Sequence, residues 1–343
     1  MKILVVGPSW VGDMVMAQTL FKCLHLQNKN LQLDVLAPVW CRELLQYMPE
    51  VSQALPLPLS HGELAIGKRR AIARTLKGNH YDQAIVLPNS FKSALVPWFA
   101  DIPLRTGWRG EMRGWLLNDC RRLDKQRYPL MVQRFAALAW AADEQLPPSL
   151  PDPALTISGS EAARLREGFS LGSERPVLVL CPGAEFGPAK QWPEQHFATL
   201  ASRYLQAGMQ VWIMGSASDS ATGEKIRNLI DKDLLEHCHS LCGRTRIGEA
   251  VCLMSEATAV VSNDSGLMHI AAALGRPLVV VYGSTSPAFT PPLSAEARTV
   301  SLSLPCSPCF KRECPLQHLD CLMKLLPQQV AEQLDELQEI VRP

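Results

Sequence analysis

Short runs of apolar, largely β-branched residues alternate along this chain with longer segments of helical periodicity. The apolar runs lie at residues 2–6, 32–36, 83–87, 177–180, 210–214, 259–262 and 278–282. Because nearly every side chain in these runs is apolar, we expect strands that are buried on both faces, as in a parallel sheet. Helical patterns lie between them at 14–26, 193–207, 248–255 and 266–274. The alternation predicts an α/β fold with doubly wound parallel sheets.

The alternation is interrupted once, in a proline-rich stretch at residues 143–176. A chain of 343 residues suits two domains of ordinary size. We therefore expect a Rossmann-like domain over 1–155 and a second one over 156–326, which a helix at 161–169 introduces. Residues 327–343 have an amphipathic pattern, and we expect there a helix that crosses back to the first domain.

Composition excludes several classes of protein. The chain has 34 basic and 33 acidic residues, for a net charge of +1, and a general polyanion binder would be more basic. No apolar run approaches the ~18 residues that a membrane-spanning helix needs. Most of the eleven cysteines are scattered. That pattern suits the reduced thiols of a cytoplasmic protein better than a secreted disulfide framework.

The first apolar run ends in Gly7-Pro8-Ser9-Trp10-Val11-Gly12-Asp13. This sequence is neither the glycine pattern of a dinucleotide fold nor a nucleotide-binding P-loop, which disfavours a nicotinamide-dependent oxidoreductase. Asp13 stands at the start of the next helix and has two interpretations. It is either an ordinary N-cap, or a base at the strand's carboxyl end that accepts a proton from a sugar hydroxyl.

The run at 177–180 leads into a loop of sequence CPGAEFGPAKQWP at 181–193. Gly183 and Gly187 would let the backbone approach a ligand, and Lys190 places a positive charge just before a helix. Backbone N–H groups, a lysine and a helix N-terminus together favour a diphosphate site, although a lone lysine is usually just solvated.

The run at 259–262 leads into Asn263-Asp264-Ser265-Gly266-Leu267-Met268-His269. Asp264 could accept hydrogen bonds from sugar hydroxyls, and Ser265 with the Gly266 N–H could bind phosphate at the helix N-terminus. His269 follows one turn later, where a structural role is equally well supported. The turns at 214–216, which includes Gly215, and at 242–245 are candidates for an adenosine pocket.

Five segments together resemble the ADP-heptose:lipopolysaccharide heptosyltransferases of glycosyltransferase family 9, most of all their type II members. They are GPSWVGD at 7–13, LPNSFKSALVP at 87–97, RTGWRGEMR at 105–113, PGAEFGPAKQWP at 182–193 and NDSGLMHIAAALGRP at 263–277. The resemblance covers nearly the whole chain. It implies a GT-B fold of two facing Rossmann-like domains, with the acceptor bound by the N-terminal domain and ADP-heptose by the C-terminal one.

The resemblance also implies the reaction. L-glycero-D-manno-heptose would pass with inversion from ADP-heptose to the first heptose of the inner core on Kdo-lipid A, with no metal required for catalysis. Type I or type III acceptor specificity is the alternative within the family. Asp13 would be the general base and Lys190 a diphosphate ligand that helps the leaving group. The expected donor-binding residues are Gly12, Gly183, Glu185, Gly215, Asp264, Ser265, Gly266 and His269.

Residues 105–127 carry seven basic side chains against three acidic ones, with Trp108 and Trp115 among them. Nucleic-acid binding is one interpretation of this pattern. An acceptor with Kdo carboxylates and lipid A phosphates explains it equally well, and we expect no nucleic-acid partner. The expected acceptor-binding residues are Trp10, Asn89, Ser90, Lys92, Arg105, Arg109 and Arg113. A second basic patch, borne on a helix, comprises Lys68, Arg69, Arg70 and Arg74. We expect a cytoplasmic protein that visits the inner membrane leaflet, where its acceptor is embedded.

Four cysteines cluster near the C-terminus as Cys306-x2-Cys309-x4-Cys314-x6-Cys321. Four thiolates satisfy tetrahedral zinc, although only the first spacing is a usual one for a zinc site. A structural zinc and a set of reduced thiols are both open interpretations, with an iron–sulfur cluster as a lesser one. Together with the basic segment, the cluster supports the alternative function of a zinc-dependent nucleic-acid-binding module, which the neutral overall charge disfavours.

Overall fold

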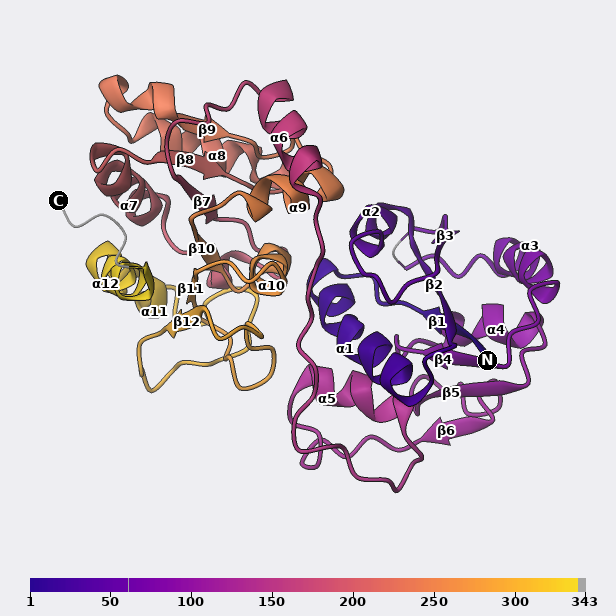
Figure 1. Ribbon diagram of the computed structural model, residues 1–343. Coiled ribbons are helices and arrows are strands. Elements are labelled where there is room, and N and C mark those ends of the chain that lie inside the picture. Colours follow the sequence, from indigo (N-terminus) through magenta and orange to yellow (C-terminus); the bar gives the residue numbers. More distant parts are fainter. Residues whose placement is uncertain (61, 339–343) are drawn as a thin grey trace. The chain divides into compact units, whose positions relative to one another are not determined.

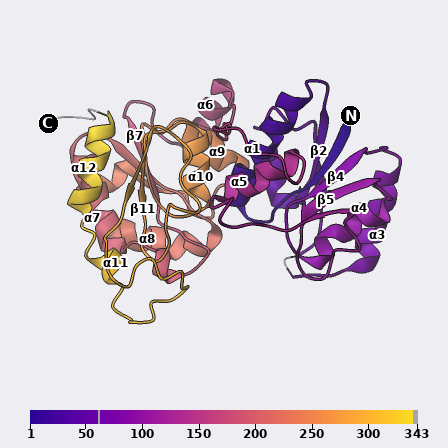
Figure 2. The same ribbon diagram turned by 90° about the horizontal axis from the view of Figure 1, so that it is seen from below.

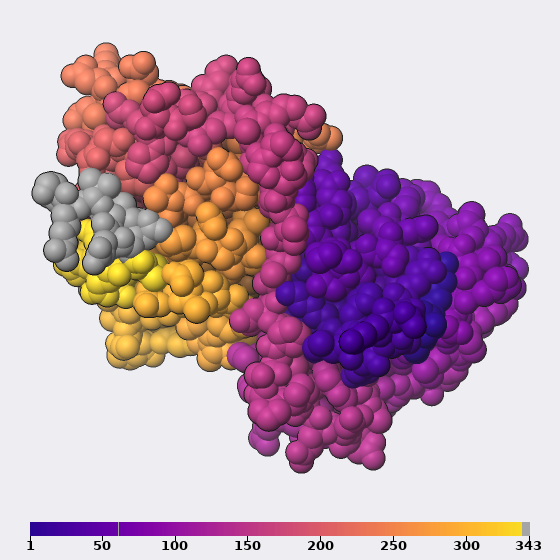
Figure 3. Space-filling model, in the orientation of Figure 1, coloured from indigo at the N-terminus to yellow at the C-terminus, as the bar shows by residue number. Residues whose placement is uncertain are grey.

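The computed structural model describes residues 1–60 and 62–338. The chain divides into two units, Met1–Pro153 and Ala154–Pro343, where the sequence indicated a boundary after residue 155. Each unit is one parallel sheet covered by helices on both faces (Figures 1 and 2). Side chains fill the space between the ribbons within each unit (Figure 3).

The sheet of the first unit has the strand order β3-β2-β1-β4-β5-β6, and its neighbouring strands are all paired in parallel. The central strand β1 pairs Val5 with Val35 on one side and with Ile85 on the other. The strands are β1 Lys2–Val6, β2 Gln32–Pro38, β3 Gln53–Leu57, β4 Gln83–Val86, β5 Leu104–Trp108 and β6 Asp119–Arg121.

Helices cover both faces of this sheet. Leu4 and Val6 contribute to a core that includes Ala73 and Leu76 of α3, on the face that α3 and α4 cover. Helices α1 and α5 contact each other and cover the opposite face (Figures 1 and 2). The helices are α1 Val11–Gln27, α2 Arg42–Leu45, α3 Ile66–Lys77, α4 Leu95–Phe99 and α5 Met131–Ala136, with 3₁₀ turns at Val39–Cys41, Phe91–Ala94 and Ala137–Ala139.

The second unit repeats this arrangement, with the strand order β12-β11-β10-β7-β8-β9 and parallel pairing throughout. Its strands are β7 Val177–Cys181, β8 Gln210–Ile213, β9 Cys238–Ser240, β10 Ala259–Asn263, β11 Leu278–Val281 and β12 Ala297–Val300. Its helices are α6 Gly159–Gly168, α7 Glu194–Gln206, α8 Ser220–Asn228, α9 Ile247–Ser255, α10 Gly266–Ala273, α11 Asp320–Met323 and α12 Pro327–Gln338. Shorter 3₁₀ turns lie at Pro188–Lys190, Ala217–Asp219 and Lys232–His237.

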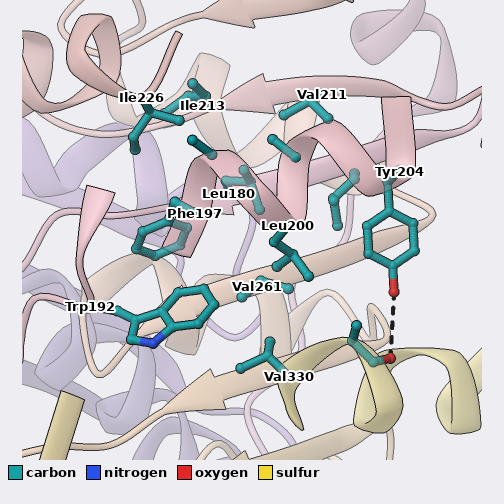
Figure 4. Close-up of a cluster of buried hydrophobic side chains, with 14 of the residues drawn as sticks. Leu180, Trp192, Phe197, Leu200, Tyr204, Val211, Ile213, Ile226, Val261 and Val330 are labelled. Atoms are coloured by element: carbon teal, nitrogen blue, oxygen red, sulfur yellow. Dashed lines mark hydrogen bonds between the residues drawn. The ribbon is translucent and has the colours of Figure 1, made fainter. Parts of the chain in front are cut away.

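The C-terminal helix α12 packs within the second unit. Val330, Ala331 and Leu334 are at most 1% exposed and join the core beneath α7 (Figure 4). The Tyr204 hydroxyl also donates to Asp335 Oδ1 at 2.7 Å. The expectation that this helix crosses to the first domain is therefore wrong for the described part, because its apolar face is already buried here. Residues 339–343, which we also expected to belong to this helix, lie outside the described residues.

In both units the strand connections change direction at the centre of the sheet, between β1 and β4 and between β7 and β10. At such a switch point the two loops that follow the central strands diverge and leave room for a ligand at the carboxyl ends of the strands. The fold therefore predicts one binding edge per unit. Among the described residues, no helix has the length and apolar character needed to cross a bilayer.

Candidate functional site

An ion pair lies at the switch point of the second unit. Lys190, which follows β7, donates from Nζ to Asp264 Oδ2, which follows β10, at 2.6 Å. The side chains are only 14% and 5% exposed. Thr285, which follows β11, donates its hydroxyl to the same carboxylate oxygen at 2.6 Å. Three loops thus meet at one carboxylate, as expected for the carboxyl edge of a parallel sheet.

Helix α10 begins beside this pair and directs its N-terminus to the same edge. Ser265 precedes the helix, and its side chain makes no capping hydrogen bond to the first turn. Its hydroxyl instead lies 3.3 Å from the Ser262 hydroxyl. The first-turn N–H groups, beginning at Gly266, therefore have no capping oxygen from Ser265, and an anion can take that place.

Asn263 holds the loops of this site together. It is fully buried, and its side chain donates from Nδ2 to the Pro182 carbonyl at 2.6 Å and accepts from the Trp192 N–H at 3.1 Å. The amide therefore clamps both ends of the loop that carries Lys190. Its role is to fix the position of the lysine rather than to bind a ligand.

The glycines of the second unit allow close packing within the protein. A Cβ at Gly183 would lie 2.4 Å from a carboxylate oxygen of Asp219, and one at Gly215 would lie 2.8 Å from Asp219 Cβ. Gly187 has φ +152°, and its Cβ would lie 2.5 Å from the carbonyl oxygen of Arg312. These glycines do permit a close approach, as expected, but the groups that approach them belong to the protein itself. Glu185 belongs to the same loop and is exposed.

His269 is buried behind the ion pair. Burial lowers its pKa to about 4, the Lys190 charge acts in the same direction and Asp264 opposes it. The imidazole is therefore neutral at pH 7. This environment supports a structural role for His269.

A cavity of about 700 Å³ lies at the switch point of the first unit. Its size falls within the usual range of ligand sites. Asp13 lines it from the first turn of α1, where a helix N-terminus favours a carboxylate. Trp10 occupies the N-cap position, so the N-cap interpretation of Asp13 is wrong. Gly12, an expected donor residue, lies in the same turn of α1 and hence in the first unit.

Four of the expected acceptor-binding residues line this cavity: Trp10, Asn89, Ser90 and Lys92. Trp10 is 49% exposed. Among the described residues, the Lys92 ammonium has no hydrogen bond or ion pair, so it can pair with an anionic ligand. The aromatic rings of Trp40 and Phe91 add apolar surface to the wall, which suits the mixed polar and apolar faces of a sugar.

The prediction that Arg113 binds the acceptor is wrong, because its side chain is completely buried and its N–H groups donate to other groups of the protein. Its guanidinium donates to the carbonyls of Trp108 and Pro88, to Asn89 Oδ1 at 3.1 Å and to Ser93 Oγ at 2.9 Å. Burial lowers its pKa to about 10, which still leaves it charged at pH 7. Arg113 therefore supports the cavity wall from behind.

The prediction that Arg105 binds the acceptor is also wrong, for a topological reason. It lies at the start of β5, whereas ligands bind at the carboxyl ends of the strands. Its guanidinium donates to the carbonyls of Leu116 at 2.7 Å and Ile102 at 2.5 Å. Arg109 follows β5 at the correct edge and is exposed, so it stays a prediction.

The four clustered cysteines do not form a recognisable metal site. Within residues 1–60 and 62–338, no group of three or more His, Cys, Asp or Glu residues is arranged to hold a metal ion. All four cysteines are free thiols around one small space. The structure thus gives no support to the structural zinc.

Several residues of these sites escaped the sequence analysis. Thr285 stands in a run of small hydroxyl residues at 284–286, and no spacing rule indicates its bond to Asp264. Asp219, Arg312 and Glu111 gave no signal at all. Glu111 accepts from the Phe91 N–H at 2.8 Å, and this contact joins two loops that only the fold brings together.

Comparisons with known proteins identify the family of this chain. The model of glycosyltransferase family 9 (heptosyltransferase) matches residues 69–320. The chain belongs to this family. It is 50% identical over 342 residues to lipopolysaccharide heptosyltransferase 2 of Salmonella typhimurium, covering 98% of each chain. It is 49% identical over 311 residues to lipooligosaccharide heptosyltransferase 2 of Haemophilus influenzae, covering 88% and 89%.

A solved structure supports the same assignment. The family 9 chain superposes on E. coli ADP-heptose LPS heptosyltransferase II with a TM-score of 0.90, at 48% identity and with 98% of each chain covered. The GT-B fold expected from the sequence, with its two parallel six-stranded sheets, is thereby confirmed. Membership also makes the protein a glycosyltransferase.

Replacement of His269 by Gln should flatten the pH dependence of stability. The folded pKa lies below the unfolded one, so the unfolded state binds the proton first as the pH falls. The stabilising contribution of the neutral imidazole is complete above pH ~6.5 and is lost progressively down to pH ~4, by about 3 kcal/mol. Urea unfolding of both proteins between these pH values measures the difference.

The exposed His80 provides the control, since its replacement by Asn should leave the pH dependence of the wild type unchanged. If His269→Gln loses stability toward acid as steeply as the wild type, His269 is not the buried neutral group described here.

Proposed function

We propose that this protein transfers L-glycero-D-manno-heptose from ADP-heptose to the first heptose of the lipopolysaccharide inner core, on Kdo-lipid A, and releases ADP. The strongest support is the 50% identity to lipopolysaccharide heptosyltransferase 2 over 98% of both chains. Transfer to another core acceptor is the alternative within the same family.

The second unit is proposed to bind the donor. Lys190 has two ammonium hydrogens directed at the Asp264 carboxylate and carbonyl oxygens, at 2.6 and 3.4 Å, and a third that a diphosphate oxygen can accept. The first-turn N–H groups of α10 lie beside it and favour negative charge. Asp264 and Thr285 offer hydrogen-bonding groups to sugar hydroxyls. Gly183, Glu185 and Gly215 complete the proposed donor loops, and the turn at 242–245 the adenosine pocket.

The first unit is proposed to bind the acceptor in its cavity. Trp10, Asn89, Ser90 and Lys92 line the space, and Arg109 lies at the same edge. Asp13 would accept the proton of the attacking hydroxyl as that oxygen bonds to C1 of the donor heptose. Since the hydroxyl attacks opposite the departing phosphate, the configuration at C1 inverts. The reaction requires the donor sugar to reach Asp13, and Gly12, an expected donor residue, precedes it in the first turn of α1.

The leaving group is ADP, which departs with an additional negative charge. Lys190 and the N-terminus of α10 would stabilise that charge electrostatically, a task that a divalent cation performs in many glycosyl transfers. We propose that these groups suffice for catalysis.

The acceptor is a membrane lipid, so we propose peripheral contact with the cytoplasmic face of the inner membrane. Helix α3 offers a surface of matching chemistry: Ile66, Arg70 and Arg74 follow one another at four-residue spacing, and all are exposed. The two arginines have no hydrogen bond or ion pair among the described residues, and their mutual repulsion is relieved by an external anion. Arg69, expected in this patch, is buried and donates to the Leu64 carbonyl at 2.6 Å.

The reaction is tested by ADP release from ADP-heptose with two acceptors. We expect rapid release with Kdo-lipid A that carries one heptose, and little with Kdo-lipid A alone. The product should gain one heptose by mass spectrometry. Faster reaction with the acceptor that lacks heptose would indicate type I specificity, and no ADP release with either acceptor would refute the proposal.

Substitutions at Asp13 and Lys190 should affect different steps. Asp13→Asn removes the base and should lower kcat by about 10²- to 10⁴-fold, while the Kd for ADP-heptose changes less than about twofold. Lys190→Gln removes a charged hydrogen bond to phosphate and should raise the Kd for ADP by about 10- to 100-fold. Steady-state kinetics and calorimetry measure these values.

Asp124→Asn and Lys225→Gln are matched controls, since both residues are exposed and lie outside the two sites. Circular dichroism shows whether Lys190→Gln remains folded despite the loss of its buried pair. Weak donor binding with near-normal turnover in Asp13→Asn would contradict its assignment as the base.

Replacement of Arg70 and Arg74 by Gln should weaken binding to anionic lipid vesicles by roughly tenfold or more, because each basic residue at a charged bilayer contributes about 1 kcal/mol. Vesicle sedimentation measures this binding, with neutral phosphatidylcholine vesicles for comparison. Replacement of Lys29 and Lys232, exposed elsewhere, should have little effect. Equal losses in both double variants would show that general charge, not α3, governs the contact.

A further inference from the structure

Four cysteines line one small space next to the proposed donor site. Cys306, Cys309 and Cys314 lie in the segment 305–319, and Cys321 lies in α11. The space measures about 20 Å³, roughly room for one water molecule. All four are free thiols, three of them partly exposed and Cys321 buried. Nothing in the proposed transfer reaction uses them.

Cys314 is the most reactive member of this group on structural grounds. Its side chain is partly exposed, and the chain turns directly after it, with the Gln317 N–H donating to the Cys314 carbonyl at 3.0 Å. Gln317 and Leu319 adopt left-handed conformations, with φ of 58° and 51°, in the turn that follows the sulfur. The backbone of this turn, at Leu319 above all, lowers the pKa of the Cys314 thiol. A thiolate that is also accessible is the nucleophile of thiol–disulfide exchange.

The other three cysteines supply a second thiol within reach. Cys306, Cys309 and Cys314 all act electrostatically on Cys321, whose pKa rises mainly through burial and further through these three neighbours. A disulfide formed at Cys314 with a small thiol would therefore have several candidate thiols beside it. An exposed cysteine without such neighbours could form only the mixed disulfide.

The cysteine segment is hydrogen bonded to the loops of the proposed donor site. The Ala189 N–H donates to the Arg312 carbonyl at 3.1 Å, and the Phe310 N–H donates to the Ser284 carbonyl at 2.7 Å. Ala189 and Ser284 also line the thiol space, and they are the chain neighbours of Lys190 and Thr285.

Side chains make a second connection. The Ser307 hydroxyl donates to the Gly283 carbonyl at 2.6 Å, on the turn that leads to Thr285. The Arg312 guanidinium lies 5.6 Å from the centre of the Phe186 ring, and Lys190 Nζ lies 5.2 Å from the same centre. The segment that carries the thiols thus supports the loop that carries Lys190.

We propose that these four cysteines form an oxidation-sensitive site, in which Cys314 reacts with a low-molecular-weight disulfide and a neighbouring cysteine then closes an intramolecular disulfide that weakens nucleotide binding. The Cys314 thiolate attacks one sulfur of the small disulfide, and one small thiolate leaves. The second cysteine, as thiolate, attacks the Cys314 sulfur and expels the other small thiolate. Two protein thiols are oxidised, and the small disulfide is reduced to two thiols.

The effect on nucleotide binding follows from the hydrogen bonds between the segments. A disulfide would draw two sulfurs together across the space, and residues 307–312 would move with them. The bonds to Ala189 and Ser284 would then be strained or lost, and Lys190 and Thr285 would no longer be held in place. This second step rests on the proposed donor site, whereas the thiol chemistry does not.

Oxidised glutathione is the probe for this site. Full-length protein, first assayed for bound metal, is incubated with it and then analysed by thiol titration, peptide mass spectrometry and ADP calorimetry. We expect the loss of two thiols, a disulfide that links Cys314 to one of its three neighbours, and at least a fivefold weaker affinity for ADP, as is usual for coupled sites. Dithiothreitol should reverse all three changes.

Two variants make the test specific. In Cys314→Ser, the remaining thiols should stay reduced and the ADP affinity should stay unchanged under the same treatment. Cys120→Ser, which removes a partly exposed cysteine of the first unit, should respond like the wild type. Mapping the disulfide in the wild type keeps the test decisive even if Cys314→Ser folds poorly.

Three results would overturn the proposal. One is oxidation that maps to cysteines outside the cluster, and another is one tightly bound zinc or iron per chain that protects the four thiols. The third is an oxidised protein with unchanged ADP affinity, which refutes the coupling. Failure of the reduced protein to bind ADP would instead count against the proposed donor site, because disulfide mapping does not depend on nucleotide binding.

Discussion

Parallel pairing in both sheets is the constraint that assembles the two candidate sites. When all strands point the same way, every loop that follows a strand emerges at one edge, and the two central loops of a doubly wound sheet diverge. In the second unit this brings together Lys190 and Asp264, which are 74 positions apart in sequence. In the first unit the same rule places Asp13 and Asn89 on the wall of one cavity. Proximity at each site is a property of strand order and not of sequence spacing.

Buried polar side chains then fix the loops that this edge leaves free. Asn263 clamps the Lys190 loop through two backbone groups, and Arg113 holds the loop at 88–93 through carbonyl and side-chain oxygens. A buried guanidinium must satisfy its donors inside the protein, because unpaired polar groups are costly there. Both residues belong to recognisable motifs, yet neither faces solvent. A motif can therefore mark the support of a site as strongly as its contacts.

The sequence predicted the central strands well because they are apolar on both faces. The strands at the four sheet edges, β3, β6, β9 and β12, escaped prediction, because edge strands carry polar residues such as Asp119 and Arg298. The interior strand β5 escaped it too, since its sequence LRTGW is not an apolar run. Loops after central strands correctly placed Asp13, Lys190 and Asp264 at the carboxyl edges of the sheets. Sequence could not separate Lys92 from Arg113, because both are basic residues in matching motifs and only packing buries one of them. Thr285 and Arg312 depend on contacts between distant loops, which no local pattern encodes.

The pairing of Lys190 with Asp264 has a consequence for selectivity. The two opposite charges nearly cancel, and the neighbouring His269 is uncharged at pH 7. A small free anion such as inorganic phosphate would have to compete with the carboxylate for the ammonium and would gain little net attraction. A sugar nucleotide offers phosphate oxygens to the lysine and hydroxyl donors to the carboxylate, so it satisfies both partners at once. At the proposed donor site, this electroneutral pair would therefore favour a ligand with both kinds of group over simple salts.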